Sequence, residues 1–398
     1  MIPGIGGSVL ERRTRSGRRE MVWGGARELV RRVISPAVLE VGDDDGIIAT
    51  GAISDWQIGP LSYVRGYGEL IRSVASLVPE ARIDHGDPDH PDLEARVVVF
   101  PFDFRRSVEE AARELARSVY SRLDHLGWSD GEQRVVVVAH SMGGLVARSW
   151  VGVNGGHRVC RGIVTLGTPH RGAPKALDVA ANGLPLGPLR VAPRLSKLLR
   201  RWPGFYELLP RYPMIAVPGL NELQYPKDLD VDWLDPARAS RAWRVHRDIE
   251  DGWAALNPRL APGVVPVFGC ATQTLEMAAV RPDGSLRSSK ARPDGMGNAE
   301  WFGDKTVPSV SAVPIELDTL QGKSSHRPQP GVKHGELVKW AGLASEITYL
   351  CTGLTTHVRG PGDRSIVVDS EELWPVGQPP AMRCSGVRTY QRGPPGAH

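Results

Sequence analysis

Residues 134–144, Arg-Val-Val-Val-Val-Ala-His-Ser-Met-Gly-Gly, decide the fold. The β-branched run over 134–139 is typical of a strand that is buried on both faces of a parallel sheet. Ser141 follows this strand, and a helix is predicted over residues 144–151. This arrangement is close to the nucleophile elbow Gly-x-Ser-x-Gly, with Ala139 in place of the first glycine. The alternative, a serine that only caps a helix, is less favoured because a buried strand precedes it.

The segments around this stretch indicate a repeated strand–helix pattern. Residues 95–100 form another β-branched run, and residues 107–126 between the two runs have apolar side chains every three to four positions, as in an amphipathic helix. A strand–helix–strand unit predicts a parallel sheet with right-handed crossovers. Further strands are predicted over 162–166 and 263–269, and a late helix over 336–350. We therefore expect an α/β protein with helices on both faces of a mostly parallel sheet.

The pattern is interrupted between residues 171 and 262, which we interpret as an inserted cap. This divides the predicted core into residues 1–170 and 263–352, and residues 353–398 form a C-terminal extension that is expected to be partly disordered. Within the cap, residues 189–212 alternate basic and apolar side chains. Such a segment could lie on an anionic membrane surface. We favour the simpler interpretation of a helix that packs its apolar face on the core.

Composition limits the classes of function. The chain has 398 residues, of which 41% are hydrophobic and 24% charged, as in globular proteins. A net charge of +4 is too small to predict a nucleic-acid partner. Four cysteines leave one or two disulfides open but form no disulfide scaffold. As it stands, the sequence begins without a signal peptide, which predicts a cytoplasmic protein; a start further upstream would allow secretion.

A serine nucleophile needs a base and an orienting acid, which in this fold follow it in the order Asp, then His. Asp304 lies in a loop that Gly303 precedes, and His334 lies just before the predicted late helix. We expect Asp304 to orient His334, and His334 to accept the proton of Ser141 and deliver it to the leaving group.

Other histidines offer alternatives to this assignment. His170 follows a predicted strand near the site and is interpreted as structural or as lining the pocket. His326 lies in a polar loop with no helix after it. His85 and His90 belong to a loop with four aspartates, where a metal site is conceivable but a solvated loop is preferred. We therefore expect no metal site in this loop.

The oxyanion of an acyl-transfer reaction needs two backbone N–H donors. One is expected from Met142, the residue after the nucleophile, and the other from an early glycine-rich turn. Residues 3–7, Pro-Gly-Ile-Gly-Gly, supply such a turn. The Ile5 amide is the first choice and the Gly6 amide is the alternative.

Several motifs occur in an order that resembles the lecithin:cholesterol acyltransferase-like branch of the α/β-hydrolases, which includes lysosomal phospholipase and bacterial lipases. They are Pro-Gly-Ile-Gly-Gly-Ser at 3–8, Pro-Phe-Asp-Phe-Arg-Arg at 101–106, Ala-His-Ser-Met-Gly-Gly at 139–144, Gly-Thr-Pro at 167–169, Gly-Asp-x-Thr-Val-Pro at 303–308, and His334. The resemblance implies the α/β-hydrolase fold, an acyl-enzyme on the serine, and no cofactor. Carried over by position, it implies a Ser141–Asp304–His334 triad with Ile5 and Met142 as oxyanion donors.

The chain departs from this family pattern at three places. Phe104 stands where the family has Trp, and Lys305 stands where Gly is common. The family's lid disulfide has no counterpart, because the first cysteine is Cys160. Residues 23–56 are therefore expected to form a lid segment without a disulfide.

Together these features predict a serine-dependent lipase, esterase or O-acyltransferase that acts on lipid or small acyl esters, with peripheral membrane contact through the cap as a further option. A thioesterase or amidase of the same fold is one alternative. A hydrolase-fold interaction module without catalysis is another, and the presence of all three triad residue types argues against it.

Overall fold

The computed structural model describes residues 1–352 except 26, 29–30, 33–34, 44, 55, 59–61, 65, 79, 129–130, 187–188, 191–192, 259, 291–301, 316 and 318–325. Its central sheet has four parallel strands in the order β16–β13–β9–β8. They are β16 (Arg327–Pro330), β13 (Gly263–Cys270), β9 (Cys160–Leu166) and β8 (Val135–His140). The last three confirm the predicted strands.

The sheet continues beyond β8 through the first residues of the chain. Ile2 forms a parallel bridge to β8, with its amide 2.9 Å from the Val138 carbonyl oxygen. The predicted strand over 95–100 is shorter than expected, because it is reduced to β7 (Val97–Val98), which pairs with β6 (Ile83–Asp84). Pro101 follows it closely and has no amide hydrogen with which to extend the ladder.

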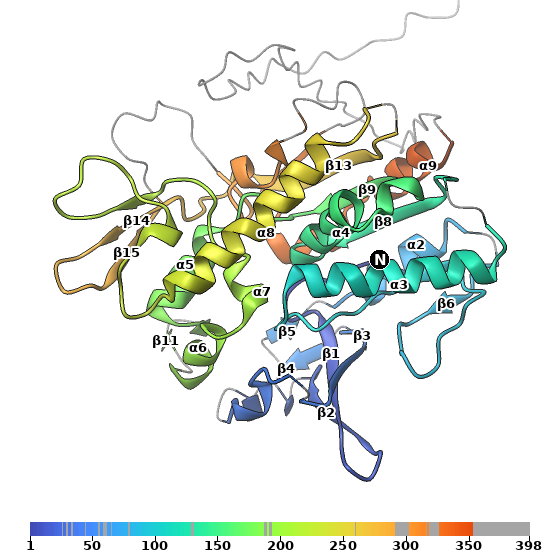
Figure 1. The fold of residues 1–398 in the computed structure, drawn as a ribbon, viewed down its shortest axis with the longest axis horizontal. Coiled ribbons are helices and arrows are strands. Elements are labelled where there is room, and N and C mark those ends of the chain that lie inside the picture. Colours follow the sequence, from blue (N-terminus) through green and yellow to red (C-terminus); the bar gives the residue numbers. More distant parts are fainter. Residues whose placement is uncertain are drawn as a thin grey trace, which may run out of the picture.

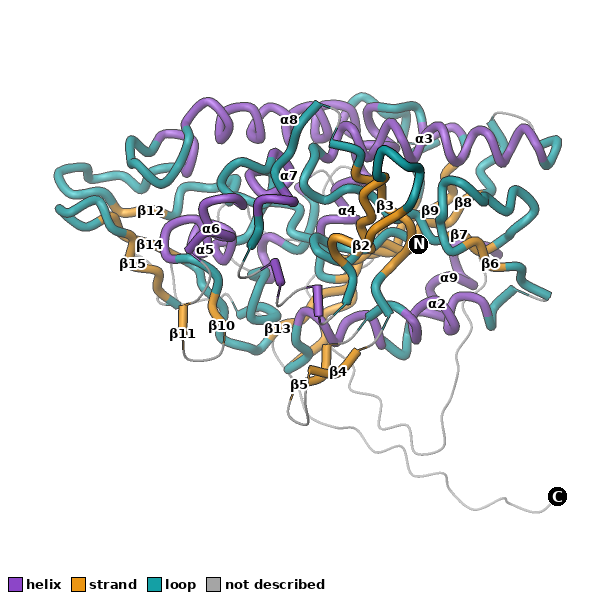
Figure 2. The backbone as a smooth tube through the Cα atoms, turned by 90° about the horizontal axis from the view of Figure 1, so that it is seen from below, coloured by secondary structure: helices purple, strands orange, loops and turns teal. Residues whose placement is uncertain are grey.

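Helices cover both faces of this sheet, as Figures 1 and 2 show. One face carries α3 (Val108–His125), α4 (Met142–Val153) and α8 (Pro236–Ala254); the other carries α2 (Gly68–Ala75), the 3₁₀ helix η6 (His334–Lys339) and α9 (Leu343–Thr352). Successive residues of the strands serve opposite faces, since Val137 packs with the first group of helices and Val138 with the second. The predicted α/β architecture is confirmed.

The helix predicted over 107–126 is confirmed as α3, which the Ser107 side chain caps by accepting a hydrogen bond from the Glu110 amide at 3.2 Å. The prediction of one continuous late helix over 336–350 is wrong. It is divided into η6 and α9, because the chain is extended at Trp340, with ψ 119°. Gly342 weakens the helix at the same place, and its bare Cα lies against the Trp340 ring.

The segment between residues 171 and 262 combines helices with long loops, and apart from α8 it lies beside one end of the sheet (Figure 1). Besides α8 it contains α5 (Pro174–Asn182), α6 (Pro193–Leu199), α7 (Pro203–Tyr206), η3 (Pro226–Asp228), and the two-residue strands β10 (Pro185–Leu186), β11 (Leu189–Arg190) and β12 (Ile215–Ala216). The apolar side chains that suggested a membrane-binding helix are buried: Leu195, Leu198, Leu199, Trp202 and Phe205. This burial favours the packing interpretation.

The sequence analysis missed α8 and the hairpin that follows β13. Asp235 caps α8 by accepting hydrogen bonds from the Ala237 and Arg238 amides, and Pro236 occupies the first helical position. The hairpin consists of β14 (Met277–Val280) and β15 (Leu286–Ser289), and it joins β12 in a small sheet. Both elements had local signals, an Asp-Pro helix start and an Asp-Gly turn.

The remaining elements lie at the periphery. β1 (Ser8–Arg13) pairs antiparallel with β2 (Arg19–Trp23) and β3 (Ile47–Ala52), and β4 (Trp56–Ile58) pairs with β5 (Ser62–Val64). The described residues also include the 3₁₀ turns η1 (Ala37–Leu39), η2 (Gly156–Arg158) and η4 (Ser309–Ser311). Three of the cysteines, Cys160, Cys270 and Cys351, are free thiols. The predicted C-terminal extension, 353–398, lies outside the described residues.

The predicted lid segment, 23–56, is fastened to the core by Arg105 rather than by a disulfide. The guanidinium is fully buried and holds Asp103 through two hydrogen bonds of 2.9 and 2.6 Å. It also donates to the Glu40 carbonyl oxygen at 3.1 Å and pairs with Asp45 at 2.9 Å. Within the described residues, no helix is long and apolar enough to cross a membrane.

Replacing Arg105 by Ala is expected to lower the free energy of unfolding by about 3 kcal/mol or more, because it leaves buried carboxylates without their partner. Urea denaturation measures the change. Arg106→Ala is the matched control: its side chain is partly exposed, so its ion pairs with Asp45 and Asp103 contribute about 1 kcal/mol or less. Equal losses in the two variants would contradict the role given to Arg105.

Candidate active site

Ser141 occupies a strained turn between the end of β8 and the start of α4. Its φ is +52° and its ψ is −125°, a conformation that only a firmly held L-residue adopts. The Ser141 amide donates to the Leu166 carbonyl oxygen of β9 at 2.8 Å. Gly143 must lack a side chain, since a Cβ there would lie 2.4 Å from the Pro3 carbonyl oxygen. The backbone around the serine is therefore closely packed, which explains why this turn needs small residues next to it.

The structure brings Ser141, His334 and Asp304 into one hydrogen-bonded chain. The His334 Nε2 atom lies 2.9 Å from Ser141 Oγ, and its Nδ1 atom lies 2.7 Å from Asp304 Oδ2. A carboxylate only accepts hydrogen bonds, so Nδ1 carries the proton and Nε2 is free to accept the serine hydroxyl hydrogen. This is the arrangement that a general base next to a nucleophile requires.

Asp304 is fixed by the loop over residues 302–308, the acid loop. Its side chain is 1% exposed, and Oδ1 accepts hydrogen bonds from the amides of Thr306 and Val307 at 2.9 and 2.7 Å. Oδ2 is thereby directed at His334. The turn places Lys305 at φ +75°, in the left-handed region that glycine adopts more readily. Glycine, which the family pattern in the sequence analysis leads one to expect here, would adopt this conformation without strain.

Gly167, which directly follows β9, leaves room for the His–Asp pair. Its φ is +61°, and a Cβ there would lie 2.9 Å from His334 Nδ1 and 3.1 Å from Asp304 Oδ2. The Gly-Thr-Pro motif at 167–169 thus has a steric reason that the sequence did not reveal. Its glycine permits the aspartate and histidine to meet beside the strand end.

The early glycine-rich turn lies against the nucleophile. The Gly7 amide donates to the Gly4 carbonyl oxygen at 2.9 Å, and Gly6 has φ +71°, as in a tight turn with glycine at its third position. A Cβ on Gly4 would lie 2.8 Å from Ser141 Cβ, so the turn and the serine are in direct contact. Gly4's own amide donates to Tyr67 Oη at 2.8 Å, which leaves the Ile5 and Gly6 amides as the turn's candidate oxyanion donors.

Met142, the other expected donor, is the first residue of α4. An amide in the first turn of a helix has no acceptor within that helix. The partial positive charge of the helix N-terminus adds to the donor strength there. The structure therefore puts both expected donors, Ile5 and Met142, on segments that adjoin Ser141.

A network around His140 links the turn to the base, and the sequence analysis did not foresee it. The Tyr67 hydroxyl lies 2.8 Å from His140 Nδ1, and His140 Nε2 lies 3.3 Å from the His334 carbonyl oxygen. Since that carbonyl only accepts, Nε2 carries the proton and Nδ1 accepts from Tyr67. Burial, with a smaller contribution from His334, lowers the pKa of His140 to about 3, so the ring stays neutral.

The other histidines take structural places. His170 is buried, lies 3.2 Å from Thr165 Oγ1, and has its pKa lowered by burial, as suits the structural interpretation. The aspartates of the loop that contains His85 and His90 pair with arginines. The pairs are Asp84–Arg122, Asp87–Arg19, Asp89–Arg19, Asp89–Arg13 and Asp92–Arg82. Over the described part of the chain, no group of His, Cys, Asp and Glu side chains is arranged for a metal ion.

Comparison with known proteins gives one match to a family model and one clear similarity of fold. A family model described as "PGAP1-like alpha/beta domain" matches residues 108–184, from α3 through β8, α4 and β9 to α5. A chain of the crystal structure of the Tle4–Tli4 complex has a TM-score of 0.60 at 15% identity, with 89% of this chain and 98% of that chain covered. This likeness concerns the fold. No curated protein matches the sequence.

Two further structures have a lower similarity to this chain, each with a TM-score of 0.35. One is Bacillus licheniformis lipase BlEst2 in mature form, at 13% identity with 64% of this chain and 78% of that chain covered. The other is the lin2722 gene product of Listeria innocua, at 12% identity with 73% and 91% covered. The resemblance noted in the sequence holds at the level of the α/β-hydrolase fold, and the acyltransferase-like branch stays a prediction.

Gly167→Ala is expected to lower the free energy of unfolding by about 3 kcal/mol, combining the left-handed backbone penalty with the clash against His334 and Asp304. Gly331→Ala is the matched control, because Gly331 has φ +74° but no atom within 4 Å of the added Cβ. Gly331→Ala should lower the free energy of unfolding by about 1 kcal/mol, because only the left-handed backbone conformation opposes the alanine. Chemical denaturation compares them, and equal costs would contradict the steric role of Gly167.

His140 is expected to make the fold less stable in acid. The ring takes up a proton near pH 6.5 in the unfolded chain but only near pH 3 in the folded protein. The neutral ring therefore contributes fully to the free energy of unfolding above pH 6.5, and this contribution is lost as the pH falls. Between pH 6.5 and 5 the loss is about 2 kcal/mol. Urea unfolding of the wild type and of His140→Gln, each at pH 6.5 and at pH 5, isolates the contribution of His140 to this loss. A difference between the two proteins that does not change with pH would contradict it.

Proposed function

We propose that this protein is a serine-dependent carboxylic ester hydrolase or O-acyltransferase that acts on lipid-like acyl esters. The observation that supports it most is the hydrogen-bonded chain from Ser141 through His334 to Asp304, built on a strained turn at the end of a sheet strand. The lipase-like α/β fold agrees with this proposal.

In the proposed reaction Ser141 Oγ attacks the acyl carbonyl carbon while His334 Nε2 accepts the hydroxyl proton. Asp304 holds His334 in the required tautomer and stabilises the imidazolium that forms. His334 then gives the proton to the leaving oxygen as the ester bond breaks, which leaves an acyl group on Ser141. Water or an alcohol attacks this acyl-enzyme with His334 again as the base, and the same steps release the acid or the new ester.

The negative charge of each tetrahedral intermediate falls on the former carbonyl oxygen. We assign its stabilisation to the amides of Met142 and Ile5. Because the Met142 amide belongs to the first turn of α4, the partial positive charge at the N-terminus of that helix also stabilises the oxyanion. The Tyr67–His140 network keeps the early turn in place, because Tyr67 occupies the Gly4 amide and His140 is hydrogen-bonded to the backbone of His334.

We propose that residues 171–262 act as the cap that selects the acyl group and the acceptor. An aromatic contact joins this cap to the lid segment: the Phe104 ring lies 5.7 Å from that of Trp23 and 5.8 Å from that of Trp202. The Trp202 indole also donates to the Leu39 carbonyl oxygen at 3.0 Å. Hydrolysis and acyl transfer share the acyl-enzyme, so the acceptor that the cap admits decides between them.

Ser141→Ala is expected to lower kcat on p-nitrophenyl esters of graded acyl length by about 10⁴-fold or more, and to abolish labelling by a fluorophosphonate. Ser76→Ala, which changes an exposed serine at the end of α2, is the control and should leave both unchanged. Wild-type protein that is neither labelled nor active on any ester, including esters presented in liposomes, would contradict the proposal.

A matched panel of oxygen esters, thioesters and amides with one acyl chain tests the substrate class. We expect oxygen esters to give the highest kcat/KM, and we expect a long-chain alcohol to trap the acyl group as a new ester if transfer operates. A clear preference for thioesters or amides would replace the ester assignment with the thioesterase or amidase alternative while keeping Ser141 as the nucleophile.

A further inference from the structure

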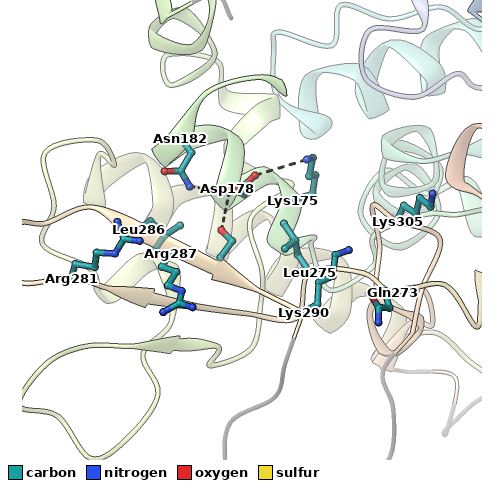
Figure 3. A pocket seen from close by; sticks show the side chains of 11 residues that line it. Lys175, Asp178, Asn182, Gln273, Leu275, Arg281, Leu286, Arg287, Lys290 and Lys305 are labelled. Atoms are coloured by element: carbon teal, nitrogen blue, oxygen red, sulfur yellow. Dashed lines mark hydrogen bonds and ion pairs between the residues drawn. The ribbon is translucent and has the colours of Figure 1, made fainter. Parts of the chain in front are cut away.

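The two lysines next to triad residues in the sequence are exposed to solvent. Lys305 follows Asp304 and Lys333 precedes His334. The Lys305 side chain lines a cavity between α5 and the β14–β15 hairpin (Figure 3). Water and salt screen the charge of an exposed ammonium group. Stabilisation of the oxyanion therefore depends on backbone amides and on how firmly these amides are held.

The turn over residues 4–7 sets the direction of the Ile5 amide. The Gly4 carbonyl and the Ile5 N–H belong to one trans peptide group, in which they point in opposite directions. The Gly4 carbonyl oxygen accepts a hydrogen bond from the Gly7 amide at 2.9 Å across the turn. The Ile5 N–H is therefore directed out of the turn, and Ile5 is only partly buried. The amide is available as a donor as long as the neighbouring peptide groups keep their orientation.

Tyr67 fixes the peptide group on the N-terminal side of Gly4. The Gly4 amide donates to Tyr67 Oη at 2.8 Å, and this hydroxyl donates to His140 Nδ1 at 2.8 Å. Burial raises the pKa of Tyr67, so the hydroxyl keeps the proton that it donates. The hydroxyl reaches the turn because Gly7 has no side chain, since a Cβ there would lie 2.8 Å from Tyr67 Oη.

Trp23 fixes the peptide group on the other side of the turn. Trp23 is the last residue of β2, and its indole Nε1 donates to the Gly6 carbonyl oxygen at 2.9 Å. That carbonyl shares a peptide group with the Gly7 amide, which closes the turn. The Trp23 ring packs edge-on against Phe104, with the ring centroids 5.7 Å apart. The first residue of the lid segment is thus bonded to the early turn itself.

We propose that Trp23 and Tyr67 are positioning residues of the oxyanion hole, which hold the Ile5 amide in its direction by binding the peptide groups on either side of it. This inference rests on the proposed ester chemistry and names the side chains that prepare its donor. A donor that is aimed before the reaction needs no reorganisation when the negative charge develops. Through Trp23, the lid segment belongs to the proposed site and does more than cover it.

Trp23→Phe and Tyr67→Phe test the proposal, because each keeps an aromatic ring and loses one hydrogen bond to the turn. In each variant kcat on a p-nitrophenyl ester is expected to fall about tenfold or more, since a small displacement of a donor weakens the transition state. KM should stay close to the wild-type value, because the lost interaction is made only in the transition state. Wild-type kcat in both variants would overturn the proposal.

Two matched controls change the same residue types on the far side of the sheet. Tyr120→Phe removes a hydroxyl that donates to the Gly155 carbonyl oxygen at 3.1 Å, beyond the C-terminal end of α4. Trp128→Phe removes a partly buried indole that lies beside Arg134, just before β8 begins. Both controls should keep the wild-type kcat. A fall in kcat as large as that of the test variants would show a general effect of losing such a group and overturn the positioning role.

A trifluoromethyl ketone with the same acyl chain distinguishes positioning from a general loss of structure, because Ser141 adds to it and forms a tetrahedral oxyanion. In Trp23→Phe and Tyr67→Phe its inhibition constant should rise by the factor by which kcat/KM falls. An inhibition constant that stays at the wild-type value while kcat/KM falls would overturn the proposal.

Hydrogen exchange of peptides that cover residues 1–8, followed by mass spectrometry, tests the turn without catalysis. The Gly4 amide should exchange about tenfold faster or more in Tyr67→Phe, and the Gly7 amide in Trp23→Phe, while Tyr120→Phe matches the wild type. If the wild type hydrolyses no ester, the proposed function fails, and faster exchange in the two variants would still support their hold on the turn. Unchanged exchange in both variants would overturn that hold, even in an active enzyme.

Discussion

The backbone of Ser141 imposes the constraint on which much of this structure depends. A φ of +52° is unfavourable for a residue with a side chain, and it persists here because contacts with the surrounding backbone fix the turn. The Leu166 carbonyl oxygen fixes its amide, and the start of α4 is pressed against Pro3. The result is a hydroxyl that projects from the sheet edge toward His334, next to the N-terminus of a helix.

The same strand ends supply the other parts of the site. Gly167 follows β9, the acid loop lies beyond β13, and His334 follows β16, so the parallel order of the sheet brings residues from distant parts of the sequence to one edge. This agrees with the general rule that open α/β sheets place their sites at the carboxyl ends of the strands. Arg105 and Trp202 donate hydrogen bonds to the carbonyl oxygens of Glu40 and Leu39, and these bonds connect the segment 23–56 with the core and with the segment between residues 171 and 262.

The sequence predicted those helices and strands that a pattern of neighbouring residues identifies. Uninterrupted β-branched runs identified β8, β9 and β13, and a capped amphipathic pattern identified α3. The contact of Ser141, Asp304 and His334 followed from motif order alone. Two further features were also marked in the sequence but were not predicted. Gly342 marks the division of the late helix, within a run of helical apolar periodicity, and the Asp-Pro pair at 235–236 marks the start of α8, within a segment that otherwise looks irregular. By contrast, no local pattern marks Tyr67, because its role depends on two partners, Gly4 and His140, that only tertiary folding brings to it. The burial of Arg105 depends in the same way on carbonyl and carboxylate groups of the lid segment.

The separation of 193 residues between Ser141 and His334 has a consequence for biosynthesis. A ribosome adds roughly 5–20 residues per second, so about 10 to 40 seconds pass between the two residues. Throughout that interval the growing chain contains the strained serine but lacks its base. Under the proposed mechanism the nascent protein cannot acylate itself or attack esters nearby, and activity begins only when synthesis has passed the last strand of the sheet.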